Sequence, residues 1–417
     1  MSVEYSDRKH ASFDSEGSET DFTESDPALQ QKHEYQGRPQ HRTRRRFTSL
    51  HVASFTTVSA LLSAVTTLLL YRLLSTTSHS RPDTSINAIN NRTLGFEKIY
   101  SIGLPNHWHK RDAQLLSAQY IGFDITHAEG VRWEDIPQTE YPVGWHDPFP
   151  ASIGCWRAHL NLLADIVSSG VSSALILEDD ADWDIFLKPQ LQEFARGALQ
   201  LQVDSHTEIT PYGDDWDMMQ LGGCEFQQAN HDHKYYLIEN DYTTIPLGNR
   251  HAQWYGPEEI PTLNNTRTVF KMGYSTCTTG YAVTQKAAQK LLSSISLPPN
   301  VEESAIDRKY GRMCAHMAGE VPLNCYAVYP PLIGMHRFAG STKADSDVLD
   351  ETEEEAYDHP EYTLDIQFST SMNVAALDAG ATVVEAQCPD EATVKEIEVG
   401  VKQEWSGSVK YFEPREM

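Results

Sequence analysis

The chain has 417 residues, of which 22% are charged and 40% are hydrophobic, enough for one large globular domain or two ordinary ones with room for tails. Its formal net charge of −26 argues against nucleic acid as a partner, because a phosphate backbone is bound by clustered Lys and Arg. The acidity is uneven, since 19 acidic and 4 basic residues occur from Ala344 onward. The middle of the chain is therefore only mildly acidic.

The N-terminal region predicts a tail followed by a membrane anchor. Residues 1–46 are polar and are expected to be a disordered cytosolic tail. Residues 47–71 contain no charged residue and are long enough to cross a bilayer as a helix, so we expect a single-pass signal anchor over 47–74 and a stem over 75–95. Because the arginines cluster before this span, the positive-inside rule places the rest of the chain in the lumen. A buried soluble helix is the alternative.

Cysteines and glycosylation sequons agree with that topology. Both Asn-x-Ser/Thr sequons, at Asn91 and Asn264, follow the span, and so do all six cysteines. Six cysteines allow 15 pairings, among which the sequence does not choose. No CxxC or Cys/His spacing indicates zinc. The cysteines are Cys155, Cys224, Cys277, Cys314, Cys325 and Cys388.

The first predicted elements after the stem alternate between strand and helix. We expect a strand over 98–104, a polar loop over 107–111, a helix over 112–122 that ends at Gly, and a short strand over 123–128. Residues 133–150 contain four prolines and predict a loop, whose Trp, His and Tyr side chains either line a groove or cover the core.

The clearest helix is predicted over 152–170, with Ser152 as N-cap and Gly170 at its end. His159 falls on the apolar face of this helix. A histidine in that position is either a hydrogen-bonded core residue or a ligand for a bound group.

Next comes an apolar run, 174–177, which predicts a buried strand and stops at Glu178, Asp179, Asp180 and Asp182. Strand alternation places Glu178, Asp180 and Asp182 on one side and Asp179 on the other. Carboxylates this close repel one another unless a cation or solvent compensates them, and they suit Mg²⁺ or Mn²⁺. The alternative interpretation is a solvated acidic turn.

The remaining elements continue the same alternation. Strands are expected over 216–221 (stopped by Gly222), 235–244, 276–284 and 325–329, and helices over 185–201, 285–293 and from 302 onward. This order predicts an α/β domain over 96–343 with a mostly parallel sheet. Residues 344–417 are expected to form an acidic extension that is partly disordered, with the like-charged run 345–361 as its disordered part.

Eight motifs between residues 98 and 340 together resemble one family. They are YSIGLPNHWHKRD, HAEG, GCWRAHLNLL, ALILEDD, WDMMQLGG, TGYAVTQKAAQKLL, SAIDRKYG and VYPPLIGMH. In this order they resemble glycosyltransferase family 25, which includes bacterial lipopolysaccharide galactosyltransferases and collagen hydroxylysine galactosyltransferases. With the anchor, they indicate a fungal-type, membrane-anchored member. GCxxxH before LxLEDD is the most specific part. The resemblance implies a GT-A fold, a nucleotide-sugar donor and usually Mn²⁺.

The resemblance also implies roles for individual residues, with His159 assigned to the donor pocket. Glu178, Asp179 and Asp180 match the acidic motif that holds the metal–diphosphate group, and Asp182 extends it as a further metal ligand. His336 stands where many GT-A enzymes place another metal ligand, with a surface-loop histidine as the alternative. Lys110 and Arg111 match basic residues that contact the diphosphate. Asp307 matches a later acid and is the candidate base of an inverting displacement, with a helix-start acid as the alternative.

The predicted function is that of a metal-dependent hexosyltransferase in the Golgi or ER membrane. It would move galactose or glucose from a UDP-sugar to a hydroxyl of a glycan or glycoprotein, using Mn²⁺ or Mg²⁺. Two alternatives stay open. One is a non-catalytic, membrane-anchored module that binds a glycan or nucleotide, and the other is a metal-dependent lumenal hydrolase.

Overall fold

The computed structural model describes residues 85–142, 144–145, 147, 149–202, 210–229, 234–250, 263–296, 305–348, 356–389 and 394–411. These residues belong to one compact unit, His79–Met417. The expected tail over 1–46 and the expected membrane anchor over 47–74 lie outside the described residues. Within the described ranges, no helix has the length and apolar character needed to cross a bilayer.

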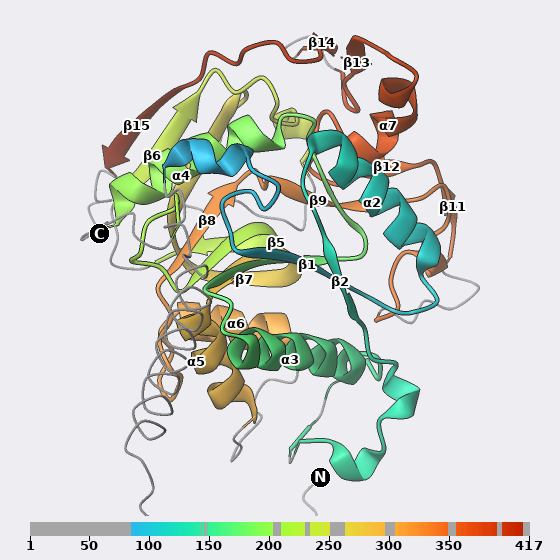
Figure 1. Ribbon diagram of the computed structural model, residues 1–417, viewed down its shortest axis with the longest axis vertical. Helices are drawn as coiled ribbons and strands as arrows, with labels where there is room; N and C mark the ends of the chain where they lie inside the picture. Colours follow the sequence, from blue (N-terminus) through green and yellow to red (C-terminus); the bar gives the residue numbers. More distant parts are fainter. Residues whose placement is uncertain are drawn as a thin grey trace, which may run out of the picture. The chain divides into compact units, whose positions relative to one another are not determined.

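An eight-stranded sheet forms the centre of this unit (Figure 1). Six strands follow the order β15-β6-β7-β3-β1-β2, and β5 and β8 pair with β7 and with each other. The strands are β1 (Lys98–Gly103), β2 (Thr126–Glu129), β3 (Ser173–Glu178), β5 (Met218–Gln228), β6 (Lys234–Glu239), β7 (Thr266–Thr284), β8 (Cys325–Tyr329) and β15 (Ser406–Tyr411).

The sheet is mixed, so the expectation of a mostly parallel sheet is wrong. Strands β1, β2 and β3 are parallel, as are β5 and β8, whereas β7 runs antiparallel to β3, β5, β6 and β8. A parallel pair needs a long crossover connection, whereas antiparallel neighbours do not. Strand β5 also continues through Gly222 and Gly223, which were expected to stop it.

Helices cover both faces of the sheet (Figure 1). On one face lie α3 (Ser152–Ser169), α5 (Gln285–Ser296) and α6 (Ile306–Cys314), and on the other lie α2 (Trp108–Ile121) and α4 (Leu187–Leu201). Consecutive residues of β3 enter different cores, with Ile176 in the first and Leu177 in the second. A strand buried on both faces is apolar at every position, which explains the unbroken apolar run before the acids.

Two helix boundaries matter for the site described below. Helix α2 begins at Trp108, so the polar loop expected over 107–111 is in fact the first turn of this helix. Helix α3 ends at Gly170, which has a φ of +76° and closes the helix as predicted.

The C-terminal extension is part of the same body. Strand β15 pairs with β6 at the edge of the central sheet, so residue 343 does not separate two compact units. A smaller sheet of order β12-β9-β4 joins the extension to the segment after β3. The remaining elements are β4 (Ala181–Trp183), β9 (Ile333–Arg337), β10 (Gly340–Ser341), β11 (Asp358–His359), β12 (Tyr362–Thr363), α7 (Thr370–Asp378), β13 (Val383–Glu385) and β14 (Glu396–Glu398), with short 3-10 helices η1 (Ile86–Asn90), η2 (Trp133–Asp135), η3 (Gln138–Glu140), η4 (Leu247–Asn249) and η5 (Thr342–Ala344).

Two disulfides cross-link strands of the central sheet to each other and to a helix. One disulfide joins Cys224 to Cys277, between β5 and β7, and the other joins Cys314 to Cys325, between α6 and β8. Cys155 and Cys388 are free.

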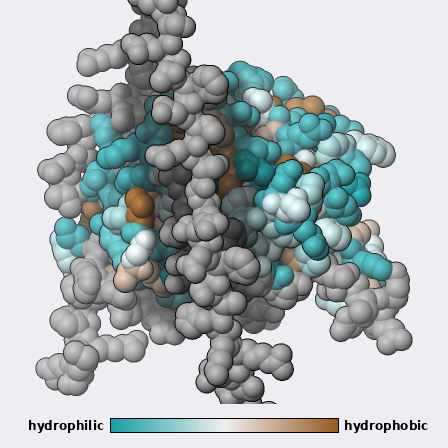
Figure 2. All heavy atoms as spheres, turned by 90° about the horizontal axis from the view of Figure 1, so that it is seen from below, coloured by the Kyte–Doolittle hydropathy of each residue, from teal (hydrophilic) through white to brown (hydrophobic). Residues whose placement is uncertain are grey.

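On the face seen in Figure 2, the described residues are mostly hydrophilic and the apolar areas are small and separate.

Candidate active site

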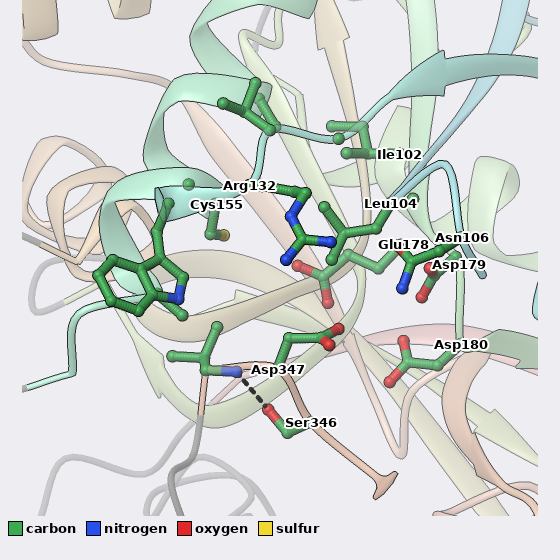
Figure 3. A pocket seen from close by; sticks show the side chains of 18 of the residues that line it. Ile102, Leu104, Asn106, Arg132, Cys155, Glu178, Asp179, Asp180, Ser346 and Asp347 are labelled. Atoms are coloured by element: carbon green, nitrogen blue, oxygen red, sulfur yellow. Dashed lines mark hydrogen bonds between the residues drawn. The ribbon is translucent and has the colours of Figure 1, made fainter. Parts of the chain in front are cut away.

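A cavity of about 330 Å³ lies where the parallel strands β1, β2 and β3 end, a size within the range of roughly 300–1,000 Å³ typical of small-molecule sites (Figure 3). We call it the strand-end cavity. Ligands of α/β sheets characteristically bind beyond the carboxyl ends of such strands. Its walls come from the ends of these strands, the start of α3 and the segment 345–348. Those wall residues include Gly103, Asn106, Lys110, Gly130, Arg132, Trp133, Gly154, Cys155, His159, Glu178, Asp179, Asp180, Asp345 and Asp347.

Glycines allow these walls to come close together. A Cβ at Gly103 would lie 2.7 Å from the Asp179 side chain, and one at Gly130 would lie 2.9 Å from the backbone of Gly103. A Cβ at Gly154, in the first turn of α3, would lie 2.4 Å from the carbonyl oxygen of Val131. Any larger residue at these positions would push the strand ends apart, so the three glycines set the width of the cavity.

The chain turns sharply after Glu178, and this turn decides where the acids point. Strand β3 ends at Glu178, and β4 begins only at Ala181. Strand alternation therefore does not run through the motif, and the expected split between the two sides is wrong. Glu178, Asp179 and Asp180 all line the cavity.

Protein groups lie close to the first two of these acids. The Thr278 hydroxyl donates to Glu178 Oε1 at 2.6 Å, while Asp179 pairs with His107 Nδ1 at 2.9 Å and with Lys110 Nζ at 3.6 Å. The hydrogen bond to Asp179 raises the pKa of the His107 imidazole, although burial opposes this effect. The chain's own basic groups thus neutralise part of the charge that was expected to need a metal ion.

Asp180 differs from Glu178 and Asp179, because one of its carboxylate oxygens is buried without a hydrogen-bond partner among the described residues. Its Oδ2 pairs with the Arg337 guanidinium at 2.5 Å, whereas its Oδ1 is buried and has no hydrogen-bond partner among the described residues. A buried carboxylate oxygen without a donor is costly, and a hard divalent cation is the ligand that suits it. The position expected to bind the metal therefore fits Mn²⁺ or Mg²⁺.

Asp182 does not belong to this site, and its assignment as a metal ligand is wrong. It is fully buried outside the cavity and accepts hydrogen bonds from the hydroxyls of Thr363 (2.8 Å) and Ser369 (2.5 Å) and from the backbone N–H of Ser371 (3.1 Å). Asp184, the residue after β4, is also buried and accepts from the N–H groups of Phe186 and Phe368. We call Asp182 and Asp184 the buried clasp, because together they hold the C-terminal extension.

His336, which was expected as a metal ligand, is part of the same buried network and does not line the cavity. It lies in β9 rather than in a loop, is 5% exposed, and its Nδ1 is 2.9 Å from the Thr363 hydroxyl that contacts Asp182. Its Nε2 faces Glu361 at 3.1 Å. Its backbone N–H donates to the carbonyl of Asp180, and its Nε2 makes no hydrogen bond among the described residues.

The two basic residues after β1 separate. Lys110 lines the cavity and is 8% exposed, since the early start of α2 directs it toward Asp179. Arg111 lies outside the cavity wall, near His127, whose pKa is lowered by burial and by the charge of Arg111. Of these two basic residues, Lys110 is therefore the one placed to contact a group bound in the cavity.

Asp307, the candidate base, lies outside the cavity wall. Its Oδ2 accepts from the N–H of Cys277 at 2.8 Å, and its Oδ1 accepts from the N–H of Arg308 at 2.7 Å. Both carboxylate oxygens of Asp307 thus accept from backbone donors, one in β7 and one in the first turn of α6. The carboxylate is nevertheless close enough to the cavity for its charge to raise the pKa of Cys155.

Several cavity residues were missed as site candidates, among them Arg132, Trp133, Asp345 and Asp347. Arg132 and Trp133 follow β2, and Figure 3 shows the Arg132 side chain directed into the cavity. Their position just after a parallel strand was an available signal, and for Trp133 the groove-lining alternative holds. Asp345 and Asp347 come from the run expected to be disordered, so composition concealed them. Asp347 lies 3.4 Å from His107 Nε2.

His159 is a hydrogen-bonded core residue that also lines the cavity. It is 1% exposed, and its Nδ1 is 2.8 Å from the Tyr281 hydroxyl, as for a core histidine. Its Nε2 points the other way and lies 3.7 Å from Glu178 Oε1 at the cavity wall. Cys155 stands one helical turn before it and also lines the cavity; burial raises the pKa of its thiol, and the charges of Glu178 and Asp307 add to this effect.

Comparison with known proteins agrees with this arrangement. A sequence model described as "Glycosyltransferase family 25 (LPS biosynthesis protein)" matches residues 150–305, which include all of α3, β3 and β7. Procollagen galactosyltransferase 1 of Danio rerio is 24% identical over 212 residues, and procollagen galactosyltransferase 2 of Mus musculus is 21% identical over 215 residues. "Probable inactive glycosyltransferase 25 family member 3" of Bos taurus is 22% identical over 214 residues.

Each of these three alignments covers 48% of this chain and 28–29% of the relative, so the chain spans less than a third of the length of the relatives it matches. Among solved structures, the mannose-1-phosphate geranyltransferase of Thermus thermophilus aligns over 56% of this chain and 58% of that chain at 11% identity. Its TM-score of 0.21 is too low to establish a shared fold. The sequence matches, in contrast, confirm the resemblance to glycosyltransferase family 25 that the motifs indicated, with the family model matching residues 150–305 of this chain.

Proposed function

We propose that this protein is a glycosyltransferase that moves a hexose, galactose or glucose, from a UDP-sugar to a hydroxyl of a glycoprotein or glycan, with Mn²⁺ or Mg²⁺ bound at Asp180. The observation that carries the proposal is the strand-end cavity. The family's GCxxxH and EDD motifs meet there, and it contains a buried carboxylate oxygen with no donor.

The charge of the cavity supports the need for a cation. Its walls carry six carboxylates, from Glu134, Glu178, Asp179, Asp180, Asp345 and Asp347, against the two permanent positive charges of Lys110 and Arg132. A diphosphate entering this field would be repelled unless further positive charge accompanied it. When bound, a divalent ion supplies that charge and neutralises the leaving diphosphate.

The chain's own residues would position the donor. Lys110 at the start of α2 and Arg132 after β2 approach the cavity from two sides and can both donate to phosphate oxygens. Trp133 offers an aromatic surface for the base or sugar. The Arg337 guanidinium holds Asp180 through Oδ2, which leaves Oδ1 directed to the ion.

The proposal is tested with the full-length protein, a panel of UDP-sugars and a glycoprotein acceptor. We expect transfer of one hexose with Mn²⁺ or Mg²⁺ and none after chelation. The variant Asp180→Ala should remove both transfer and Mn²⁺ binding, measured by electron paramagnetic resonance of the free ion. Full transfer by Asp180→Ala, or by the metal-free enzyme, would refute the assignment.

A second candidate is a non-catalytic module that binds the same ligand. The relative from Bos taurus named as a probable inactive family member, 22% identical over 214 residues, supports this candidate. This candidate predicts that calorimetry detects UDP-sugar binding with Mn²⁺ while the product assay stays blank.

We further propose that residues 47–74 anchor the protein in the Golgi or ER membrane with the domain in the lumen. The two disulfides support this topology, since such bonds persist in oxidising compartments. Protease protection of intact microsomes tests it. We expect the folded domain to be protected and to become accessible only after detergent is added. Cleavage of the domain in intact microsomes would reverse the topology.

A further inference from the structure

The start of α3 and the end of β3 bring a thiol, an imidazole and a carboxylate together. The ligand atoms of Cys155, His159 and Glu178 all lie within 4.8 Å of one another. We propose that these three residues bind Zn²⁺, at a site separate from the Asp180 carboxylate. The inference does not depend on the proposed transfer reaction.

The spacing of the residues fits a zinc site. Cys155 and His159 are four residues apart in α3, so they lie on the same face of the helix. His159 Nε2 and Glu178 Oε1 are 3.7 Å apart, too far for a good hydrogen bond. Two ligands about 2.0–2.2 Å from a tetrahedral ion are separated by roughly 3.4 Å, so a small movement of the Glu178 side chain would complete the pair.

The kinds of ligand select the metal. A thiolate and an imidazole favour Zn²⁺, whereas Mn²⁺ and Mg²⁺ favour oxygen ligands such as Asp180. On binding, the Cys155 thiol releases its proton to solvent and binds as thiolate, His159 binds as neutral imidazole, and Glu178 binds as carboxylate. The two metals would thus occupy different ligand sets on one cavity wall.

Neighbouring groups already hold two of the ligands in place. The Tyr281 hydroxyl is 2.8 Å from His159 Nδ1, which leaves Nε2 directed to the proposed ion. The Thr278 hydroxyl donates to Glu178 Oε1 at 2.6 Å. Outer contacts of this kind orient metal ligands in proteins, and their loss weakens binding about 10- to 100-fold.

The fourth position of the ion would open into the strand-end cavity, because all three residues line it. A zinc site with three protein ligands keeps that position for water or for a group of a bound molecule. If the cavity binds a nucleotide sugar as proposed above, bound Zn²⁺ would compete with it, and the enzyme would be inhibited by zinc in the presence of Mn²⁺.

The test uses Co²⁺ as a spectroscopic substitute for Zn²⁺ in the full-length protein with its disulfides intact. We expect visible bands of tetrahedral Co²⁺ and a near-ultraviolet band from thiolate to Co²⁺, both removed by added Zn²⁺. Competition with a chromophoric chelator then gives the Zn²⁺ affinity. Neither readout requires enzymatic turnover, so failure of the zinc site and failure of the proposed reaction are distinguishable.

Matched variants identify the ligands. Cys155→Ser should remove the thiolate band, while Cys388→Ser, which changes the other free cysteine, should leave it unchanged. Glu178→Gln keeps the thiol and should weaken Zn²⁺ binding, and Tyr281→Phe should weaken it about tenfold. A thiolate band that persists in Cys155→Ser, or wild-type protein that shows no such band, would overturn the proposal.

Discussion

The cavity acids (Glu178, Asp179 and Asp180) and the buried clasp (Asp182 and Asp184) lie within seven residues of one another, yet they have opposite surroundings. The cavity acids are partly exposed, and two of them pair with basic side chains. The clasp acids are buried and accept only from neutral hydroxyl and backbone N–H donors. Acid-rich composition therefore does not define a metal site. Because the chain turns between β3 and β4, the cavity acids line the cavity, whereas the clasp acids are buried against the C-terminal extension.

The largest expected difference between the cavity acids and the buried clasp is in how the unfolding free energy depends on pH. Burial raises the pKa of Asp184 from 3.8 to about 8, even though two backbone N–H groups lower it. Because the folded pKa is the higher one, the stabilising contribution is fully present below pH 3.8 and is lost as the pH rises toward 8. Across this range the loss is on the order of 5 kcal/mol.

We expect Asp184→Asn to remove most of this dependence. Chemical denaturation at several pH values between 4 and 8 measures the unfolding free energy of both proteins. Asp180→Asn is the control from the cavity group and should keep the wild-type profile. Parallel profiles for wild type and Asp184→Asn would show that Asp184 is ionised in the folded protein.

Removing Asp182 should act on stability. Asp182→Ala leaves two hydroxyls and one backbone N–H without their acceptor in a fully buried site, at a cost of at least about 3 kcal/mol in unfolding free energy. Denaturant titration measures the loss. The affinity for Mn²⁺, determined on the folded fraction, should not change. Weaker Mn²⁺ binding with unchanged stability would return Asp182 to the metal site.

Changing Asp180 should have the converse effect. Asp180→Asn keeps an oxygen for Arg337 but removes the charge offered to the cation, so we expect transfer to fall about 100-fold. The unfolding free energy should fall by only about 1 kcal/mol, because the pair with Arg337 is only partly lost. Initial rates at saturating Mn²⁺ and denaturation of the same sample provide both numbers. A large stability loss without a rate effect would place Asp180 in the clasp.

The smallest effect is expected at the rim of the cavity. Asp347 is 53% exposed and lies near His107, so solvent screens most of its charge. Asp347→Asn should lower the KM for the UDP-sugar roughly twofold, because one repelling charge leaves the diphosphate path. Asp358→Asn, in β11, is a matched change outside the cavity wall and should leave KM unchanged. An increase in KM would show that Asp347 assists binding.

Local patterns predicted the central part of the fold. β1, α3 and β3 follow from apolar runs and caps within a few residues, and these elements place Gly103, His159 and Glu178 around one cavity. The antiparallel arrangement of β7 was not predictable in this way, because it depends on partners far apart in the sequence.

The extension was missed for the same reason. Its strands are short, and β12 and β15 pair with β9 and β6, which lie far away in the sequence. The turn at 179–180 was hidden as well, since consecutive acids carry no periodicity. As a result, the acids predicted together do not stay together: Glu178, Asp179 and Asp180 line the cavity, whereas Asp182 and His336 both contact Thr363 in the buried network.

The pairing of β15 with β6 determines what proteolytic cleavage before β15 would do to the protein. A protease that cut within the acidic run after residue 348 and released the C-terminal part would expose the backbone of β6, an edge open to other chains. The same cut would remove the donors to Asp182 and one of the two backbone donors to Asp184. The shortened product should then precipitate instead of persisting as a smaller enzyme, so cleavage at this point would act as an irreversible off-switch.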